Sequence, residues 1–305
     1  FQSIPGENNN IPYLIDGRNY KLTNWWDLFY NWDNSINQNK TLWTNESNEE
    51  SNIYLDENGI TIKAEAWAEI GDKGIIDGIE YTLVNEAKLR EMIANDEDVT
   101  KIVTTKVTNM NNLFKGKSNF NQPIDSWDVS NVTTMWDTFY GTSFNQDISN
   151  WDVSNVSVMQ GTFAYSSFNQ DISNWDVSNV TWMVLMFWES EFNKPLNNWD
   201  VSNVTNMQGV FSKASNFNQD IGDWDTSSVT NMSSLFSNAS AFNQDIGNWN
   251  TSNVTIINSI FKDATSFNQD LSSWCLINIT SEPNTFATGA TAWTLPKPVW
   301  GTCPE

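Results

Sequence analysis

The chain has 305 residues, and its 37 acidic and 15 basic side chains give a formal net charge of −22 at neutral pH. A surface this acidic repels nucleic acids and anionic lipid headgroups, which excludes both as partners. The sequence has no histidine, which excludes Ser-His-Asp and Cys-His catalysis and removes the commonest zinc ligand. We therefore expect a protein that is not an enzyme and that holds no cofactor or metal.

Residues 1–75 show no repeat and are predicted to form a separate N-terminal region or an arm. They include the aromatic-rich stretch TNWWDLFYNWDN at positions 23–34. Three tryptophans in it are secondary candidates for contact with a sugar or a protein, namely Trp25, Trp26 and Trp32. The chain begins with Phe1 and shows no signal-peptide pattern, so we expect an exported protein whose signal peptide has been removed. It also lacks the run of roughly 18 apolar residues that a transmembrane segment needs.

Residues 76–106 are predicted to be an N-terminal cap. Apolar side chains alternate along an expected strand at Ile79, Tyr81 and Leu83. Asn85 follows at a position suited to capping a helix, whose inner face would consist of Leu89, Met92 and Ile93.

Residues 107–286 repeat with a spacing of 24 or 25, and residues 144–156 recur unchanged at 168–180. Three apolar rows run through the units, with valine, methionine and phenylalanine at i, i+3 and i+7; one unit shows them as Val156, Met159 and Phe163. This spacing predicts a short helical segment in each unit. The remainder of each unit, FNQDISNW, is predicted to be a short extended piece bounded by turns.

A single unit cannot bury its own apolar face, so the units are expected to stack. We predict an α/β repeat solenoid of the leucine-rich-repeat-like type, with about eight coils and a cap at each end. Each coil of 24–25 residues would carry one short strand and one short helical segment. One asparagine per coil, from Asn121 to Asn268, is expected to form an internal amide ladder.

Residues 287–305 are predicted to be the C-terminal cap. The only two cysteines are Cys275 and Cys303, both near this end. We expect a disulfide between them, with two free core thiols as the alternative. A disulfide would place the protein in an oxidising compartment outside the cytoplasm.

The unit FNQDISNWDVSNVT, followed by methionine and phenylalanine, resembles the repeat of BspA-like bacterial surface proteins, which are often grouped with leucine-rich repeats. The lead-in YTLVNEAKLREMIANDEDVTKIVTTKVTNM and the ending AWTLPKPVWGTCP are similar to the flanks of such domains in Bacteroidetes. The resemblance spans residues 55–305. It implies a secreted or outer-surface protein associated with adhesion, and the family has no shared catalytic residues to carry over.

We expect the functional residues at positions where individual units depart from the consensus sequence of the repeat. Outward positions of the predicted helical segment are usually small or polar, but in three successive coils they are bulky. These residues form the predicted partner-binding patch: Trp136, Tyr140, Val158, Tyr165, Trp182, Val184 and Trp188. An exposed aromatic patch typically marks a partner site. The alternatives are that residues 1–75 cover the patch or that it has no special role.

Other rows have structural and functional interpretations. The seven-tryptophan row could be a sugar platform, but its alignment with phenylalanine and isoleucine favours a place in the core. Two aspartate rows are expected to cap turns, with calcium binding as the alternative. A pair of carboxylates could serve a glycosidase, and one threonine per coil gives slight support for ice binding.

We therefore expect a non-catalytic repeat protein, extracellular or on the bacterial cell surface, that binds a protein or a glycan. The binding would serve adhesion or protein interaction. One alternative is a structural or accessory subunit of an outer-membrane protein complex, docked through residues 1–75. The other is a carbohydrate-binding module.

Overall fold

The computed structural model describes residues 13–15, 18–20 and 52–304. The chain divides into two compact units, Phe1–Asn52 and Ile53–Glu305. In the first unit, β1 (Tyr13–Ile15) and β2 (Arg18–Tyr20) pair antiparallel. The secondary candidates Trp25, Trp26 and Trp32 lie outside the described residues.

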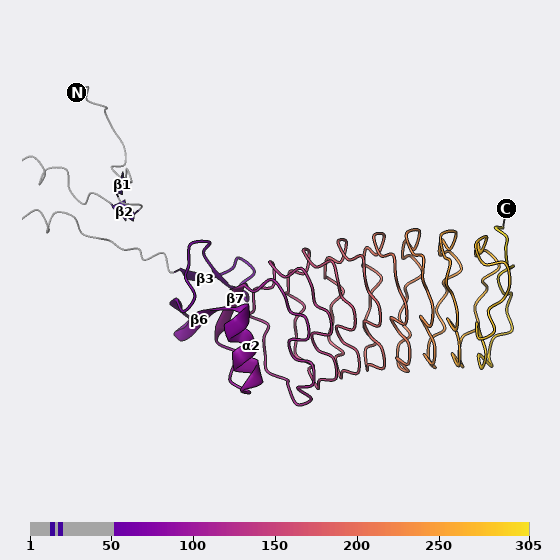
Figure 1. The fold of residues 1–305 in the computed structure, drawn as a ribbon, viewed down its shortest axis with the longest axis horizontal. Coiled ribbons are helices and arrows are strands. Elements are labelled where there is room, and N and C mark those ends of the chain that lie inside the picture. The colour runs from indigo at the N-terminus through magenta and orange to yellow at the C-terminus, as the bar shows by residue number, and fades with distance from the viewer. Residues whose placement is uncertain (1–12, 16–17, 21–51, 305) are drawn as a thin grey trace, which may run out of the picture. The chain divides into compact units, whose positions relative to one another are not determined.

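The second unit opens with two small sheets and one helix. Strands β3 (Ile53–Leu55) and β4 (Ile62–Ala64) form an antiparallel pair. Strand β6 (Ile79–Asn85) pairs antiparallel with β5 (Lys73–Ile76) and parallel with β7 (Ile102–Lys106). Helix α2 (Glu86–Ala94) connects β6 to β7 and lies beside the first coils (Figure 1).

Helix α2 forms where the sequence predicts it. The side chain of Asn85 accepts a hydrogen bond from the backbone N–H of Lys88 at 2.9 Å, which satisfies one of the free donors at the start of the helix. Leu89 and Ile93 are buried on its inner face. Met92 is partly buried and packs against the same core.

The boundary between the two units differs from the predicted one. Residues 53–75 pack with the strands that follow them, because Ile53 and Ile62 share a buried cluster with Leu83 and Val103. The backbone N–H of Ile62 also donates to the carbonyl of Ser126 at 2.8 Å, which ties β4 to the first repeats. The end of the arm therefore lies near residue 52, and sequence periodicity missed it because these strands have no repeat.

Successive repeats lie side by side in sequence order, as Figure 1 shows. Parallel β-bridges join neighbouring coils one after another from Asn109 to Ile256. Examples are the bridges from Thr134 to Val158 and from Val158 to Trp182. Backbone N–H groups of one coil donate to carbonyls of the next, as Met135 does to Val158 at 2.9 Å and Phe139 to Thr162 at 2.9 Å. Every coil thus satisfies some backbone groups of its neighbour, while hydrogen bonds within its own turns satisfy others.

The interior contains the predicted apolar rows. Val156, Met159 and Phe163 are all fully buried, and their equivalents from residue 107 to residue 261 are at most 1% exposed. Phenylalanines of adjacent coils stack, with ring centroids 5.5 Å apart for Phe139 and Phe163. The rows therefore form one continuous core.

The tryptophan row belongs to this core. Its seven members are 0 to 4% exposed. Each indole donates from Nε1 to a carbonyl of the preceding repeat, except that Trp127 donates to Val99; Trp175, for example, donates to Ile148 at 3.1 Å. Because the ring is covered and its donor is used, this row cannot serve as a sugar platform.

The predicted helical segment of each coil is not a helix. Residues 107–286 contain turns and single bridges only. Thr138 N–H donates to the carbonyl of Met135 at 3.2 Å, three residues back, and Asp137 between them has φ +52°, as in a type II turn. Two such turns reproduce the i, i+3, i+7 spacing. A helix cannot form because the neighbouring coil takes the alternate N–H groups.

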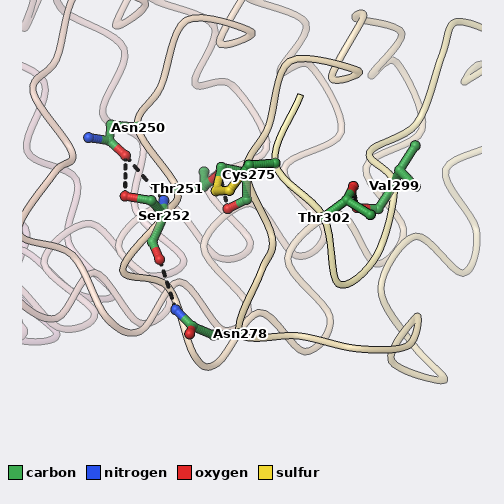
Figure 2. The surroundings of a disulfide bond; sticks show 8 residues. Asn250, Thr251, Ser252, Cys275, Asn278, Val299 and Thr302 are labelled. Carbon is green, nitrogen blue, oxygen red and sulfur yellow. Dashed lines mark hydrogen bonds between the residues drawn. A yellow bond between two sulfur atoms is a disulfide. The ribbon is translucent and has the colours of Figure 1, made fainter. Parts of the chain in front are cut away.

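The last coil is covered by the C-terminal tail. Asn268 Oδ1 accepts the backbone N–H groups of Thr294 at 2.8 Å and Leu295 at 3.0 Å. Cys275 and Cys303 form the predicted disulfide (Figure 2). Beside it, Thr251 donates to the carbonyl of Cys275 at 3.0 Å. Within the described part of the chain, no helix has the length and apolar character needed to cross a bilayer.

Candidate binding face

The predicted patch residues fall into two groups. The first, here called the indole pair, consists of Trp136 and Trp182, each 43% exposed. The second, here called the aromatic row, consists of Tyr140, Tyr165 and Trp188. The described residues include no ring contact between the two groups, nor between Trp136 and Trp182, so the structure brings together only Tyr140, Tyr165 and Trp188.

The indole pair is held by amide side chains. Trp182 donates from Nε1 to Gln160 Oε1 at 3.1 Å. Gln160 belongs to the coil between those of Trp136 and Trp182 and occupies the same repeat position as Trp136. The backbone N–H of Trp136 donates to Asn111 Oδ1 at 2.9 Å. Both indoles thus project from backbone that the neighbouring coils fix in place.

The aromatic row is continuous across three coils. Tyr165 meets Tyr140 edge-on with centroids 5.3 Å apart, and it meets Trp188 edge-on at 4.5 Å. A lysine lies over each outer ring, Lys115 at 4.8 Å from the Tyr140 centroid and Lys213 at 5.5 Å from that of Trp188. These two ring faces are therefore partly occupied by cations of the same chain.

Each of these lysines also forms an ion pair. Lys115 Nζ lies 2.6 Å from an Asp137 carboxylate oxygen, and Lys213 Nζ lies 2.8 Å from one of Glu189. Desolvation raises the pKa of the Tyr165 hydroxyl, and the Glu189 carboxylate raises it further. The aromatic row is thus bordered by charged groups, in contrast to the indole pair.

Two bulky residues in these coils adopt left-handed backbone conformations. Tyr165 has φ +54° and Leu185 has φ +57°. The equivalent position is Gly141 in the coil before Tyr165, and it is Gly161 and Gly209 on either side of Leu185. A left-handed conformation costs about 1–2 kcal/mol in a residue other than glycine. The same two repeat positions have positive φ in the other coils as well, for example in Asp137 and Lys213, so the left-handed conformation belongs to the turns of the repeat.

The two valines of the predicted patch have different positions. Val158 is half-buried and bridges Thr134 and Trp182. Val184 is only 8% exposed and does not belong to the surface, which corrects the prediction. Its equivalents in the coils on either side are the longer Gln160 and Gln208, so a short side chain between them lies below the surface.

The edge of the coils that carries the indole pair has no charge. We call it the uncharged edge; it comprises six seven-residue segments without Asp, Glu, Lys or Arg, namely residues 130–136, 154–160, 178–184, 202–208, 227–233 and 252–258. Its outward groups are mainly hydroxyls and amides. Sequence analysis did not single out this edge or Gln160, although aligning the repeats column by column would have revealed both.

The aspartate rows cap turns. Asp176 Oδ1 accepts the backbone N–H of Ser178 at 3.0 Å and its hydroxyl at 2.6 Å. These hydrogen bonds, the one from the hydroxyl first, hold the pKa of Asp176 below its ordinary value. Among the described residues, no group of three acidic or cysteine side chains is arranged to hold a metal ion. The carboxylates are thus placed as hydrogen-bond acceptors for the turns.

A family model described as "Mycoplasma protein of unknown function, DUF285" matches the chain twice, over residues 85–194 and 189–295. The chain belongs to the DUF285 family. The two matches together cover most of the second unit, and the first contains both the indole pair and the aromatic row. No curated protein and no solved structure matches the chain significantly.

Proposed function

We propose that this DUF285 protein binds another macromolecule without catalysis at a bacterial cell surface, in adhesion or protein interaction. In this proposal the stacked coils are a solenoid of the leucine-rich-repeat-like type whose coils are built from turns and single bridges, and the protein is of the BspA-like kind known from Bacteroidetes. The disulfide supports a place outside the cytoplasm, because such bonds persist in oxidising compartments.

One observation carries the proposal: exposed aromatic side chains gather on three successive coils, whereas the equivalent positions elsewhere are mostly small or polar. Trp136, Tyr165 and Trp182 are 38 to 43% exposed. Trp and Tyr are the residues most enriched among those that dominate binding energy at interfaces.

A second candidate is an accessory subunit of an outer-membrane surface complex. The aromatic row supports it, because rings bordered by the ion pairs Lys115–Asp137 and Lys213–Glu189 are suited to a protein neighbour. In that case the aromatic row would contact a second protein. The indole pair would then contribute little to the affinity.

The test uses the full chain on arrays of glycans and of extracellular-matrix proteins. We expect the double variant Trp182→Ala/Trp188→Ala to lose at least 90% of the binding signal of the wild type. Ile256→Ala is the matched control, because Ile256 occupies the repeat position of Trp182 and is 44% exposed. If the double variant binds every wild-type ligand with unchanged affinity, the proposal is wrong.

A further inference from the structure

We infer that the indole pair is a binding site for an uncharged, unbranched polysaccharide that lies along the direction in which the coils stack. This inference rests on the proposed function and names the ligand class. Pyranose rings present apolar C–H faces that stack on indoles, and their hydroxyl groups require polar partners nearby. The uncharged edge supplies both kinds of group.

Charge is the first argument for this ligand class. The protein has a net charge of −22, yet the six segments of the uncharged edge contain no ionisable side chain. A basic protein partner would be attracted to the aspartate rows, and an anionic polysaccharide would be repelled by the protein as a whole. An uncharged ligand is suited to this edge, because the edge has no ionisable side chain to pair with a charged one.

Spacing is the second argument. Trp136 and Trp182 belong to coils that are separated by one other, and neighbouring β-bridged backbones lie about 4.8 Å apart. The two indoles are therefore separated by about 10 Å along the stack. Trp136 follows Met135 whereas Trp182 precedes Met183, so the indoles are also offset by two residues across the stack. Each pyranose of an extended chain advances by a distance close to one coil spacing. A chain that runs along the stack at an inclination can thus meet both indoles and pass Gln160 between them.

Gln160 is the third argument. Its Oε1 accepts from Trp182 Nε1 and holds the indole in position. Its Nε2 has no acceptor within the described residues, so it is available to donate to a sugar hydroxyl or ring oxygen. The Gln160 side chain therefore orients the indole of Trp182 and provides a hydrogen-bond donor between the two indoles. Because the indole is already held in place, less conformational entropy is lost when the ligand binds.

Ordered acceptors flank the indoles. Asn155 and Asn179 donate from Nδ2 to carbonyls of the preceding coil, both at 2.7 Å, and this fixes their side chains. In the described part of the chain neither Oδ1 accepts a hydrogen bond. The hydroxyls of Ser157 and Thr181 are fixed likewise by the preceding coil, at 3.3 and 3.4 Å. Sugar hydroxyls laid along this edge would meet a regular series of such acceptors.

The aromatic row is less suited to this ligand. Lysines lie over Tyr140 and Trp188, and Tyr165 meets both neighbours edge-on. Stacking of a sugar there would require displacement of a cation. We therefore assign the polysaccharide to the indole pair, and the aromatic row provides a control within the same three coils.

The experiment is native affinity electrophoresis of the full chain in gels that contain one soluble polysaccharide each. The neutral probes are the unbranched polysaccharides mixed-linkage β-glucan, pullulan and hydroxyethylcellulose, and the anionic probes are alginate and polygalacturonate. We expect at least one neutral probe to retard the wild type and neither anionic probe to do so. Retardation by none of the neutral probes overturns the inference, and so does equal retardation by the anionic ones.

Variants locate the site on the probe that binds. We expect Trp136→Ala and Trp182→Ala each to weaken binding at least 10-fold, and Gln160→Ala to weaken it about 3- to 10-fold, the loss of one hydrogen bond. Ile256→Ala should bind like the wild type, and Trp188→Ala, which changes the aromatic row, is measured to separate the two surfaces. Unchanged thermal midpoints would show that the exposed substitutions leave the fold intact.

The two proposals fail in different ways. If Trp188→Ala abolishes binding and the indole variants do not, the polysaccharide site is wrong while binding through the aromatic face stands. If the arrays show binding to matrix proteins only, the ligand class is wrong and the proposed function again stands. If no variant changes any binding, both proposals fail.

Discussion

Leu185 lies directly over Gly209 of the next coil, where an added Cβ would be 2.6 Å from Leu185 Cδ2. Gly209 also has φ +61°. We expect Gly209→Ala to lower the free energy of unfolding by about 1–3 kcal/mol, about 1–2 kcal/mol for the backbone and up to about 1 kcal/mol for displacing the half-buried end of the Leu185 side chain. Denaturant titration followed by tryptophan fluorescence measures the loss.

Gly141→Ala is the matched control. Gly141 has φ +70°, but a Cβ there would meet nothing within 4 Å. Its substitution should cost only the backbone contribution of about 1–2 kcal/mol. Equal losses for both variants would show that Leu185 moves aside freely and that the contact does not limit this position.

The asparagine ladder should be sensitive to loss of a single acceptor. Asn169 Oδ1 accepts the backbone N–H of Asn193 at 2.9 Å. Asn169→Ala leaves this partly buried donor unpaired, at a cost of about 1–3 kcal/mol. Asn169→Asp keeps an acceptor oxygen and should cost less. Thermal unfolding of both variants makes the comparison, and an equal decrease in midpoint would argue against the hydrogen bond as the cause.

Reduction of the disulfide should destabilise the C-terminal end. Cys275 and Cys303 are 28 residues apart, and a loop of this length corresponds to about 3–4 kcal/mol of chain entropy. Because each coil contacts only its neighbours, amide exchange should increase over residues 271–304 and remain unchanged near Val156. Hydrogen exchange with mass spectrometry, with and without a phosphine reductant, measures this.

The variant Cys303→Ser serves as the control for reduction. It should exchange like the reduced wild type and should not respond to the reductant. An even increase in exchange along all coils would contradict the local effect.

Acid should weaken the turns that aspartates cap. Hydrogen bonds from the hydroxyl and backbone N–H of Ser227 hold the pKa of Asp225 below its ordinary value. Since the pKa is lower in the folded state, the stabilisation is complete above the unfolded pKa of about 3.9 and is lost as pH falls through the folded value. We expect the thermal midpoint to fall as the pH is lowered below about 4.

Asp225→Asn isolates that contribution. Asn250 occupies the equivalent position in the next coil and accepts from Ser252 N–H and Oγ at 3.1 and 2.7 Å, so an amide caps the turn without a charge. Acid also relieves repulsion arising from the net charge of −22, so the variant is compared with the wild type at each pH. The variant should lose less stability than the wild type below about pH 4; parallel curves would refute the prediction.

The buried rows were predictable because they repeat. Val156, Met159 and Phe163 recur in every unit, and only stacking can bury all of them. The local conformation was not predictable, because an i, i+3, i+7 pattern arises from a helix and also from two successive turns. The choice depends on where backbone N–H groups donate, and the neighbouring coil decides that.

The candidate site was predictable in part for a related reason. Trp136, Trp182 and Tyr165 stand out as departures from the consensus, and the structure exposes them. Gln160 did not stand out, because a glutamine at a polar position looks ordinary until its contact with Trp182 is known. Val184 was misjudged because its burial depends on the lengths of side chains in the adjacent coils.

Each coil presents its neighbours with the same donors and acceptors, and residues 144–156 and 168–180 are identical. A gene that gains or loses one such unit would therefore encode a protein whose remaining coils still fit together. The number of coils is free to drift by unequal recombination between the matching stretches. The ends, closed by α2 and by the Cys275–Cys303 link, would be inherited unchanged by proteins of every length.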